Sequence, residues 1–334
     1  MSVEENARRD LVVIGSSAGG VDTLKRVVSG LPPDLAATVC IVLHIAPSSP
    51  SALARILARS GPLACHQAAD GDVLRPAQIL VAPPNRHLVI EDNHVRLTVG
   101  PRENGHRPAV DTLFRSAAQA GDGRVVGVVL SGNQDDGTAG LAAIKARGGA
   151  TIVQDPQDAL YPGMPASAVA NFAVDQIVPS QEIAAAIAAI VTTHDPPFSE
   201  EPEDPTPPED SLTSVCPDCG GVLTEEREAG VSFWRCRVGH RYSPEHLVEA
   251  QASNIESAMW AAIRALQDRT ALLERLARQT EARGNTISAR AFRQRAAAAA
   301  EQVVLLRDAL TQASTTTLSS VPDVPPNEAL EAEG

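Results

Sequence analysis

Short runs of valine, isoleucine and leucine alternate with helical patterns through residues 11–191, and this alternation limits the fold more than any other feature of the chain. The expected strands are Leu11–Ile14, Val39–Leu43, Gln78–Val81, Val125–Leu130 and Ala150–Val153. Helices are expected over Val21–Val28, Ser51–Leu57, Val110–Ala118 and Ala139–Arg147, with an antiparallel hairpin over His87–Glu91 and His94–Val99. Apolar strands separated by helices form parallel sheets that are covered on both faces. The predicted fold class is therefore α/β, with a doubly wound, mainly parallel sheet.

The acidic residues are concentrated in two segments outside this pattern. The formal net charge is −13, and much of it lies in the stretch 195–215, which is rich in proline and lacks lysine and arginine, and in the tail 314–334. Such segments are extended and solvated, so 195–215 is predicted to be a linker and 314–334 a disordered tail. The remaining chain has no basic excess, which argues against nucleic-acid binding.

The region 247–313 is predicted to be a helical hairpin or coiled coil. Apolar residues recur at steps of three and four, with Arg269 as a polar exception: Ala252, Ile255, Met259, Ala262, Leu266, Leu273 and Leu276, then Ala289, Phe292, Ala296, Ala299, Val303, Leu306 and Leu310. Gly284–Asn285 is a helix stop between the two runs. Two interpretations stay open: the helices pack only on each other, or they form a homodimer interface.

Cysteine content and hydropathy indicate the compartment. The chain has five cysteines and a polar, charged amino terminus without a secretory signal. Its longest aliphatic run, Ile183–Val191, is shorter than the roughly 20 residues that a membrane-spanning helix needs. We therefore expect a cytoplasmic protein without membrane insertion, whose thiols are metal ligands or core residues.

The turn after the first strand carries a candidate nucleophile. Gly15-Ser16-Ser17-Ala18-Gly19 fits the G-x-S-x-G pattern of a nucleophile elbow. A dinucleotide site would have glycine at position 17 and an acid at the end of the second strand, where this chain has His44. These two departures make a dinucleotide-dependent enzyme the weaker interpretation.

Two further polar residues follow other strands of the same sheet. His44 ends the second strand, and Asp136 comes shortly after the run Val125–Leu130. Ligands of doubly wound sheets bind at the carboxyl ends of the strands, where Ser17, His44 and Asp136 can converge as a triad. Taken singly, His44 could be an ordinary loop histidine and Asp136 a helix cap. The order Ser, His, Asp along the chain differs from the order Ser, Asp, His of α/β-hydrolases, which indicates a different kind of hydrolase.

The chain resembles CheB-type protein-glutamate methylesterases of bacterial chemotaxis. The matching stretches are Ile14–Gly20, Val42–Pro47, Arg107–Arg115, Leu130–Gly137 and Gly163–Pro165. The resemblance covers residues 11–191, and the catalytic domain is predicted over residues 1–194. The resemblance implies that Ser17 is the nucleophile, His44 the base and Asp136 the orienting acid. It also implies hydrolysis of glutamate methyl esters on chemoreceptors, and glutamine deamidation by the same chemistry, with no cofactor for catalysis.

The chain departs from the family pattern at Ala18, where the family has threonine, and at Asn133–Gln134, where it has Met-Gly. A receiver domain upstream of the first strand is not expected. The rival hypothesis is a catalytically weak or inactive scaffold protein of a sensory array, and the intact Ser17, His44 and Asp136 favour the enzyme.

The segment 216–246 is predicted to be a zinc ribbon. Cys216-x-x-Cys219 and Cys236-x-x-x-His240 have the spacing of a tetrahedral structural zinc site with Cys3His ligands. The segment has four arginines against five acids and therefore no basic face, which suits a protein partner better than nucleic acid. The linker is expected to leave no rigid packing between the two halves of the chain. Because the zinc ligands fill their own coordination shell, we expect the ribbon to offer no group to the chemistry.

Overall fold

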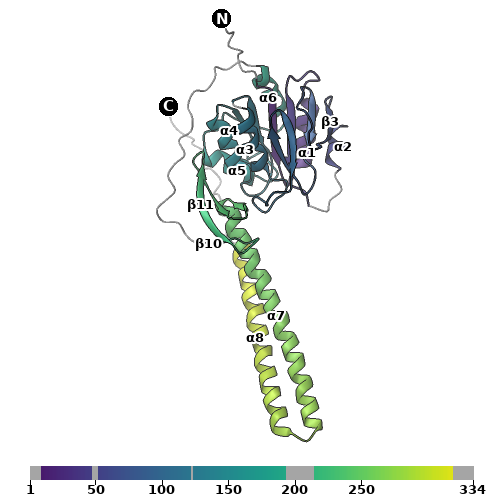
Figure 1. The fold of residues 1–334 in the computed structure, drawn as a ribbon, viewed down its shortest axis with the longest axis vertical. Helices are drawn as coiled ribbons and strands as arrows, with labels where there is room; N and C mark the ends of the chain where they lie inside the picture. The colour runs from purple at the N-terminus through teal and green to yellow at the C-terminus, as the bar shows by residue number, and fades with distance from the viewer. Residues whose placement is uncertain (1–8, 47–51, 122, 193–213, 319–334) are drawn as a thin grey trace, which may run out of the picture. The chain divides into compact units, whose positions relative to one another are not determined.

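A seven-stranded parallel sheet forms the centre of the first half of the chain (Figure 1). The computed structural model describes residues 9–46, 52–121, 123–192 and 214–318. The sheet order is β3-β4-β2-β1-β7-β8-β9. The strands are β1 (Leu11–Ser16), β2 (Thr38–Leu43), β3 (Ala64–Gln67), β4 (Gln78–Val81), β7 (Val125–Val129), β8 (Ala150–Gln154) and β9 (Gln176–Val178). All neighbouring strands pair in parallel.

Both faces of the sheet are buried, as the apolar runs predict. On one face Val12 and Ile14 of β1 pack with α1 (Gly20–Gly30), α2 (Leu53–Leu57) and α6 (Ile183–Thr192). On the other face Leu11 and Val13 pack in a second cluster. That cluster is formed with α3 (Val110–Gly121), α4 (Thr138–Ala146), α5 (Gly163–Asn171) and the hairpin β5 (His87–Glu91)–β6 (His94–Thr98). The predicted doubly wound α/β fold is confirmed.

Two strands have no counterpart among the predicted ones, and both lie at the edges of the sheet. β3 is largely exposed, and β9 has only three residues with no buried position. An edge strand that is partly exposed lacks the continuous apolar run that marks a central strand. Their absence from the sequence-based list therefore follows from their position.

The topology gathers three strand ends beside β1. The chain leaves β1 for β2 on one side and later returns to β7 on the other side, and both strands pair directly with β1. This reversal is the switch point at which doubly wound folds bind their ligands. The carboxyl ends of β1, β2 and β7 therefore lie together.

A small antiparallel sheet follows the predicted linker, most of which lies outside the described residues. Its strands are β10 (Ser214–Val215), β11 (Val222–Glu228), β12 (Val231–Cys236) and β13 (Arg241–Tyr242). We call residues 214–243 the ribbon. Its core contains Cys216, Leu223, Cys236, Tyr242 and Leu247. Residues 1–250 make up one compact unit and residues 251–334 a second.

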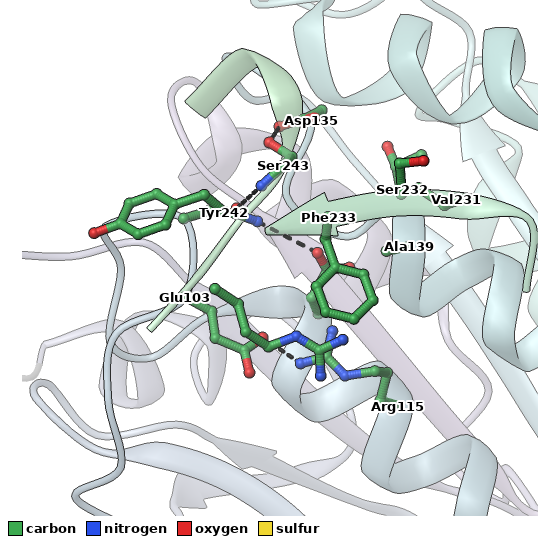
Figure 2. Close-up of a pocket in the computed structure, with 13 residues that line it drawn as sticks. Glu103, Arg115, Asp135, Ala139, Val231, Ser232, Phe233, Tyr242 and Ser243 are labelled. Carbon is green, nitrogen blue, oxygen red and sulfur yellow. Dashed lines mark hydrogen bonds and ion pairs between the residues drawn. The ribbon is translucent and has the colours of Figure 1, made fainter. Parts of the chain in front are cut away.

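The ribbon contacts the α/β domain within the first unit. Ser243 Oγ donates a hydrogen bond to Asp135 over 2.7 Å (Figure 2). Glu228 of the ribbon lies 3.6 Å from Arg115. The expectation that no rigid packing joins the two halves is therefore wrong. The composition of the linker indicates an extended segment, but it carries no information on whether the parts that it joins contact each other.

Two long helices form the last described part of the chain. α7 (Pro244–Ala282) and α8 (Thr286–Leu318) are separated at Gly284, whose φ of +80° suits glycine. Beyond residue 250 they pack through Met259, Ile263, Leu266, Val303, Leu306 and Leu310. The predicted tail begins five residues too early, because α8 extends to Leu318; residues 319–334 lie outside the described part.

The apolar seam of α8 is as expected, whereas that of α7 differs. Ala252 and Ile255 of the predicted seam are exposed, and from Met259 on alternate positions are shifted. Ile263 is buried where Ala262 was expected, and the polar exception Arg269 is exposed while Thr270 is partly buried. The seam thus follows the same heptad period with one of its two positions moved by one residue. Among the helices described, none is both long enough and apolar enough to span a bilayer.

Candidate active site

Ser17 lies on a sharp turn between β1 and α1 that two glycines permit. Gly19 has a φ of +73°, and a Cβ there would lie 2.9 Å from Ser131 Oγ. A Cβ on Gly15 would lie 2.1 Å from a methyl group of Val110. Side chains at either position would push neighbouring segments away. The G-x-S-x-G pattern is therefore required by this backbone, and the turn has the form of a nucleophile elbow.

The side chains of Ser17, His44 and Asp136 form one chain of hydrogen bonds. Ser17 Oγ lies 3.1 Å from His44 Nδ1, and His44 Nε2 lies 2.7 Å from Asp136 Oδ2. Asp136 is an acceptor, so Nε2 carries the proton and Nδ1 presents its lone pair to the serine hydroxyl. The structure thus brings together the three residues that the sequence placed at neighbouring strand ends.

Asp136 is fully buried and is held in its charged form by donors. Its Oδ2 accepts the Val110 N–H at 2.7 Å, and its Oδ1 accepts the Asp111 N–H at 3.2 Å. Both donors belong to the first turn of α3, whose dipole also favours an anion. Burial alone would raise the pKa of Asp136, but the hydrogen bond and charge of His44 bring that pKa below its usual range. The carboxyl group is therefore a permanent acceptor for His44.

Two neighbouring histidines and a second acid also belong to the site, and sequence reasoning missed them. The His106 ring stacks on the His44 ring with centroids 3.7 Å apart, and His246 meets His106 edge-on at 5.9 Å. Burial, followed by the charge of His44, lowers the pKa of His106 to about 3. Asp111 Oδ1 accepts the N–H groups of Gly137 and Gly140. Burial, followed by the charge of Asp136, raises the pKa of Asp111.

The serine next to the nucleophile has a different environment. Ser16 is fully buried, and its hydroxyl donates to the Ser131 carbonyl over 2.9 Å. It also lies beneath Gly20, where a Cβ would be 2.1 Å from Ser16 Oγ. Ser16 therefore serves packing between the first strand and the loop after β7, while Ser17 is the accessible hydroxyl of the pair.

A cavity of about 320 Å³ opens beside Ser17. Its lining comes from the elbow and α1, with Asp22 and Arg26, and from the segment after β8, with Asp158 and Leu160. Asn133 and Gln134, which depart from the family pattern, are not among the residues that line this cavity. Asn133 is exposed, and Gln134 is half-buried with a φ of +62°. The cavity is large enough for a side chain to reach the hydroxyl.

The four predicted metal ligands form a second cluster, in the ribbon. Cys216 Sγ and Cys236 Sγ lie 3.7 Å and 3.5 Å from His240 Nδ1, and the sulfur atoms of Cys219 and Cys236 lie 3.6 Å apart. All four ligand atoms lie within 4.8 Å of one another, and none of the cysteines is in a disulfide. The cluster could hold a metal ion. Cys40 and Cys65 lie in the α/β domain, away from it.

Known proteins match the half of the chain that contains the triad. Residues 12–187 match the family model for CheB methylesterase. A protein-glutamate methylesterase/protein-glutamine glutaminase 2 of Anaeromyxobacter dehalogenans is 42% identical over 181 residues, which are 54% of this chain and 53% of that protein. A putative protein-glutamate methylesterase/protein-glutamine glutaminase of Leptospira interrogans is 36% identical over 176 residues, 52% of this chain and 91% of that protein. The chain thus spans about half the length of the Anaeromyxobacter relative.

The fold has a match among solved structures. The crystal structure of the Thermotoga maritima CheB methylesterase catalytic domain superposes with a TM-score of 0.52 and 30% sequence identity, covering 54% of this chain and 97% of that domain. The family match covers more than half of the chain and contains Ser17, His44 and Asp136. The chain therefore belongs to the CheB methylesterase family.

Proposed function

We propose that the protein is a serine hydrolase that removes methyl esters from glutamate side chains of chemoreceptors and deamidates glutamines by the same route. The observation that carries the proposal is the unbroken hydrogen-bond chain from Ser17 through His44 to Asp136, at the edge of the sheet where such folds bind ligands. A binding protein that had lost catalysis would have no need of this geometry, and no described residue interrupts it.

In the proposed mechanism, Ser17 Oγ attacks the ester carbonyl and His44 Nδ1 accepts its proton. Asp136, which accepts from Nε2, holds the ring and stabilises the imidazolium. The N–H of Ala18, the residue after the nucleophile, is suited to stabilise the oxyanion, as in other elbows. His44 then gives this proton to the ester oxygen as the C–O bond breaks, and methanol leaves. When the substrate is glutamine, the proton goes to the amide nitrogen as the C–N bond breaks, and ammonia leaves. Water hydrolyses the resulting glutamyl-Ser17 ester, with His44 again as the base.

We also propose that the ribbon binds one structural zinc ion through Cys216, Cys219, Cys236 and His240. Bonds of about 2.3 Å to sulfur and about 2.0 Å to nitrogen give a tetrahedron with S···S edges of about 3.8 Å and S···N edges of about 3.5 Å. The measured separations of 3.6 Å and 3.5–3.7 Å fit these values. Four protein ligands fill the shell, so the metal would stabilise the fold of the ribbon and take no part in hydrolysis.

We further propose a cytoplasmic protein, because every cysteine is a free thiol. The partners proposed are methyl-accepting receptors, without nucleic acid. A homodimer through α7 and α8 remains an alternative to packing of the two helices on each other alone. Exposed apolar residues outside the seam, such as Leu272 and Leu305, leave room for it.

The test is methanol release from a receptor fragment carrying radiolabelled methyl esters, with the full-length protein. We expect release by the wild-type protein and by Ser29→Ala, which removes an exposed hydroxyl on α1, and none above background by Ser17→Ala. An inactive wild-type protein, or a fully active Ser17→Ala, would remove the proposal.

A further inference from the structure

The end of the ribbon is hydrogen-bonded to a loop that supports the triad. The Asn104 N–H donates to the Arg241 carbonyl over 2.9 Å, and the Arg241 N–H donates to the Arg102 carbonyl over 3.4 Å. Asn104 is buried and has a φ of +50°, a conformation that asparagine tolerates better than most residues. The ribbon thus pairs with the backbone at Arg102 and Asn104, on both sides of Glu103.

The amide of Asn104 links this pairing to Asp136. Its Oδ1 accepts the Ser243 N–H at 2.9 Å, and its Nδ2 donates to Asp136 Oδ1 at 3.1 Å. Nδ2 also lies 3.3 Å from Asp111 Oδ2. Only the oxygen of an amide accepts a hydrogen bond, so the Ser243 N–H requires the nitrogen to face the two carboxyl groups. The ribbon therefore determines which end of the amide meets Asp136.

A second contact holds the loop in which Asp136 lies. Asp135, its neighbour in sequence, accepts from Ser243 Oγ at 2.7 Å (Figure 2). Asp135 also lies 2.5 Å from His246 Nδ1. Ser243 also caps α7, because its hydroxyl accepts the His246 N–H. One residue at the end of the ribbon thus contacts both Asn104 and Asp135.

The surrounding contact is closely packed and charged. Glu228 of the ribbon lies 2.8 Å from Arg241 and 3.6 Å from Arg115. Arg115 also pairs with Glu103 (Figure 2). The cavity that remains there measures about 20 Å³, room for a single water molecule. Partly buried ion pairs of this kind position the ribbon more specifically than exposed pairs do.

We propose that Asn104 is a positioning residue for Asp136 and that the segment Arg241–Ser243 fixes its amide, so that the ribbon completes the catalytic site. This inference rests on the proposed hydrolase function. It is distinct from blocking of the site, because the described residues that line the cavity beside Ser17 all come from the α/β domain. The ribbon supports the acid end of the triad and leaves the nucleophile open.

The first test replaces the donor while keeping its shape. Asn104→Asp retains an oxygen for the Ser243 N–H but turns a carboxyl group toward Asp136, whereas Asn104→Ala removes both ends. With p-nitrophenyl acetate and the full-length protein, we expect kcat to fall about 10- to 100-fold in both variants, with KM within about twofold, since a misplacement of about 1 Å costs that much. The control is Asn93→Ala, which removes an exposed asparagine with a similar φ of +63°.

The pH profile separates positioning from a merely structural role. An added carboxylate beside Asp136 favours the imidazolium form of His44, so the acid limb of kcat/KM should move to higher pH in Asn104→Asp. If Asn104 only held the loop, Asn104→Asp would retain the wild-type rate and profile, and that result would overturn the proposal.

The second test addresses the ribbon. Ser243→Pro removes both the N–H and the hydroxyl, and the extended β13 tolerates a following proline, whereas Ser243→Ala removes the hydroxyl alone. We expect kcat to be at least about 10-fold lower in Ser243→Pro than in Ser243→Ala. Equal rates in two folded variants would show that the Ser243 N–H does not act on the triad. If Ser243→Pro fails to fold, Asn104→Asp decides.

Reaction of Ser17 with a fluorophosphonate distinguishes the two proposals. A wild-type protein that reacts with neither the ester nor the fluorophosphonate would remove the hydrolase function and this inference with it. A reactive wild-type protein with unchanged rates in Asn104→Asp would remove the inference alone.

Discussion

The two side-chain clusters of the first unit are assembled in opposite ways. Ser17, His44 and Asp136 are separated by 27 and 92 residues and are brought together by three parallel strands. The cysteines and His240 lie within 25 residues of one another, on the turns of a small sheet. The first cluster is held by a large apolar core on both faces of a sheet. The second has few buried residues around it, so we expect its geometry to depend on a bound metal.

The two kinds of site should therefore respond differently to the loss of one functional side chain. A site built by a sheet survives the loss of one functional side chain, because the strands remain packed. A site built by a short segment loses its fold together with its ligand. We expect this difference between the triad and the metal cluster to appear in single variants, from the nucleophile, where the effect is largest, to the charge of a histidine, where it is smallest.

The largest effect is expected at the nucleophile. Ser17→Ala should lower methanol release to background, about 10⁴-fold or more, because the hydroxyl forms the acyl-enzyme. Circular dichroism and the melting temperature should stay at wild-type values, since Ser17 is only half-buried. A large fall in stability would mean that the sheet does not hold the site independently of its side chains.

The next effect is expected at the ribbon. Metal analysis should give one zinc per wild-type chain and close to none in Cys236→Ser, whose ribbon amides should lose protection from hydrogen exchange. The control is Cys65→Ser, which changes a cysteine of β3 outside the cluster and should retain the zinc. If the amides of a metal-free ribbon kept full protection from hydrogen exchange, the ribbon would fold without zinc, contrary to this prediction.

Two adjacent leucines of α7 test whether local spacing also determines the helical unit. Leu273 is 5% exposed and Leu272 56% exposed. We expect Leu273→Ala to destabilise the α7–α8 unit by about 2–5 kcal/mol and Leu272→Ala by less than about 0.5 kcal/mol, measured by hydrogen exchange of α7 amides. Similar losses in both variants would reveal a second packed face, as in a homodimer.

The smallest effect concerns the charge state of the buried site. The pKa of His106 is lowered to about 3, so the unfolded chain, with an ordinary histidine pKa of about 6.5, binds more protons below that pH. Stability should therefore be lost as pH falls from about 6.5 toward 3. Between pH 7 and pH 5 the wild-type protein should lose about 2 kcal/mol more than His106→Phe in urea unfolding. Equal losses would mean that the fold does not hold His106 in its neutral form.

The central strands and the triad were predictable because their signals are local. Each central strand is apolar on both faces, and Ser17 and His44 directly follow such strands. The glycines around Ser17 also leave a pattern in the sequence. β3 and β9 carry no such signal, because a strand at the edge of a sheet is partly exposed.

The supporting residues could not be predicted, because their roles arise from contacts between distant segments. Asn104 is a turn residue by its sequence, and only its contacts with Asp136 and Ser243 reveal more. His106 directly precedes the stretch Arg107–Arg115 that carries the family resemblance, so its place beside that stretch was a usable signal.

Arg269 was a usable signal for the helices. A charged residue in an apolar seam indicates that this position of the seam was assigned one residue too early.

We propose that Ser17 is a nucleophile activated by His44 and Asp136. The most direct test of this role is mass spectrometry of the full-length protein after reaction with a fluorophosphonate. We predict one adduct per chain, on the peptide that contains Ser17, and at least about 100-fold slower labelling in His44→Ala, which lacks the base. Labelling at another serine, or equal labelling rates with and without His44, would contradict the account.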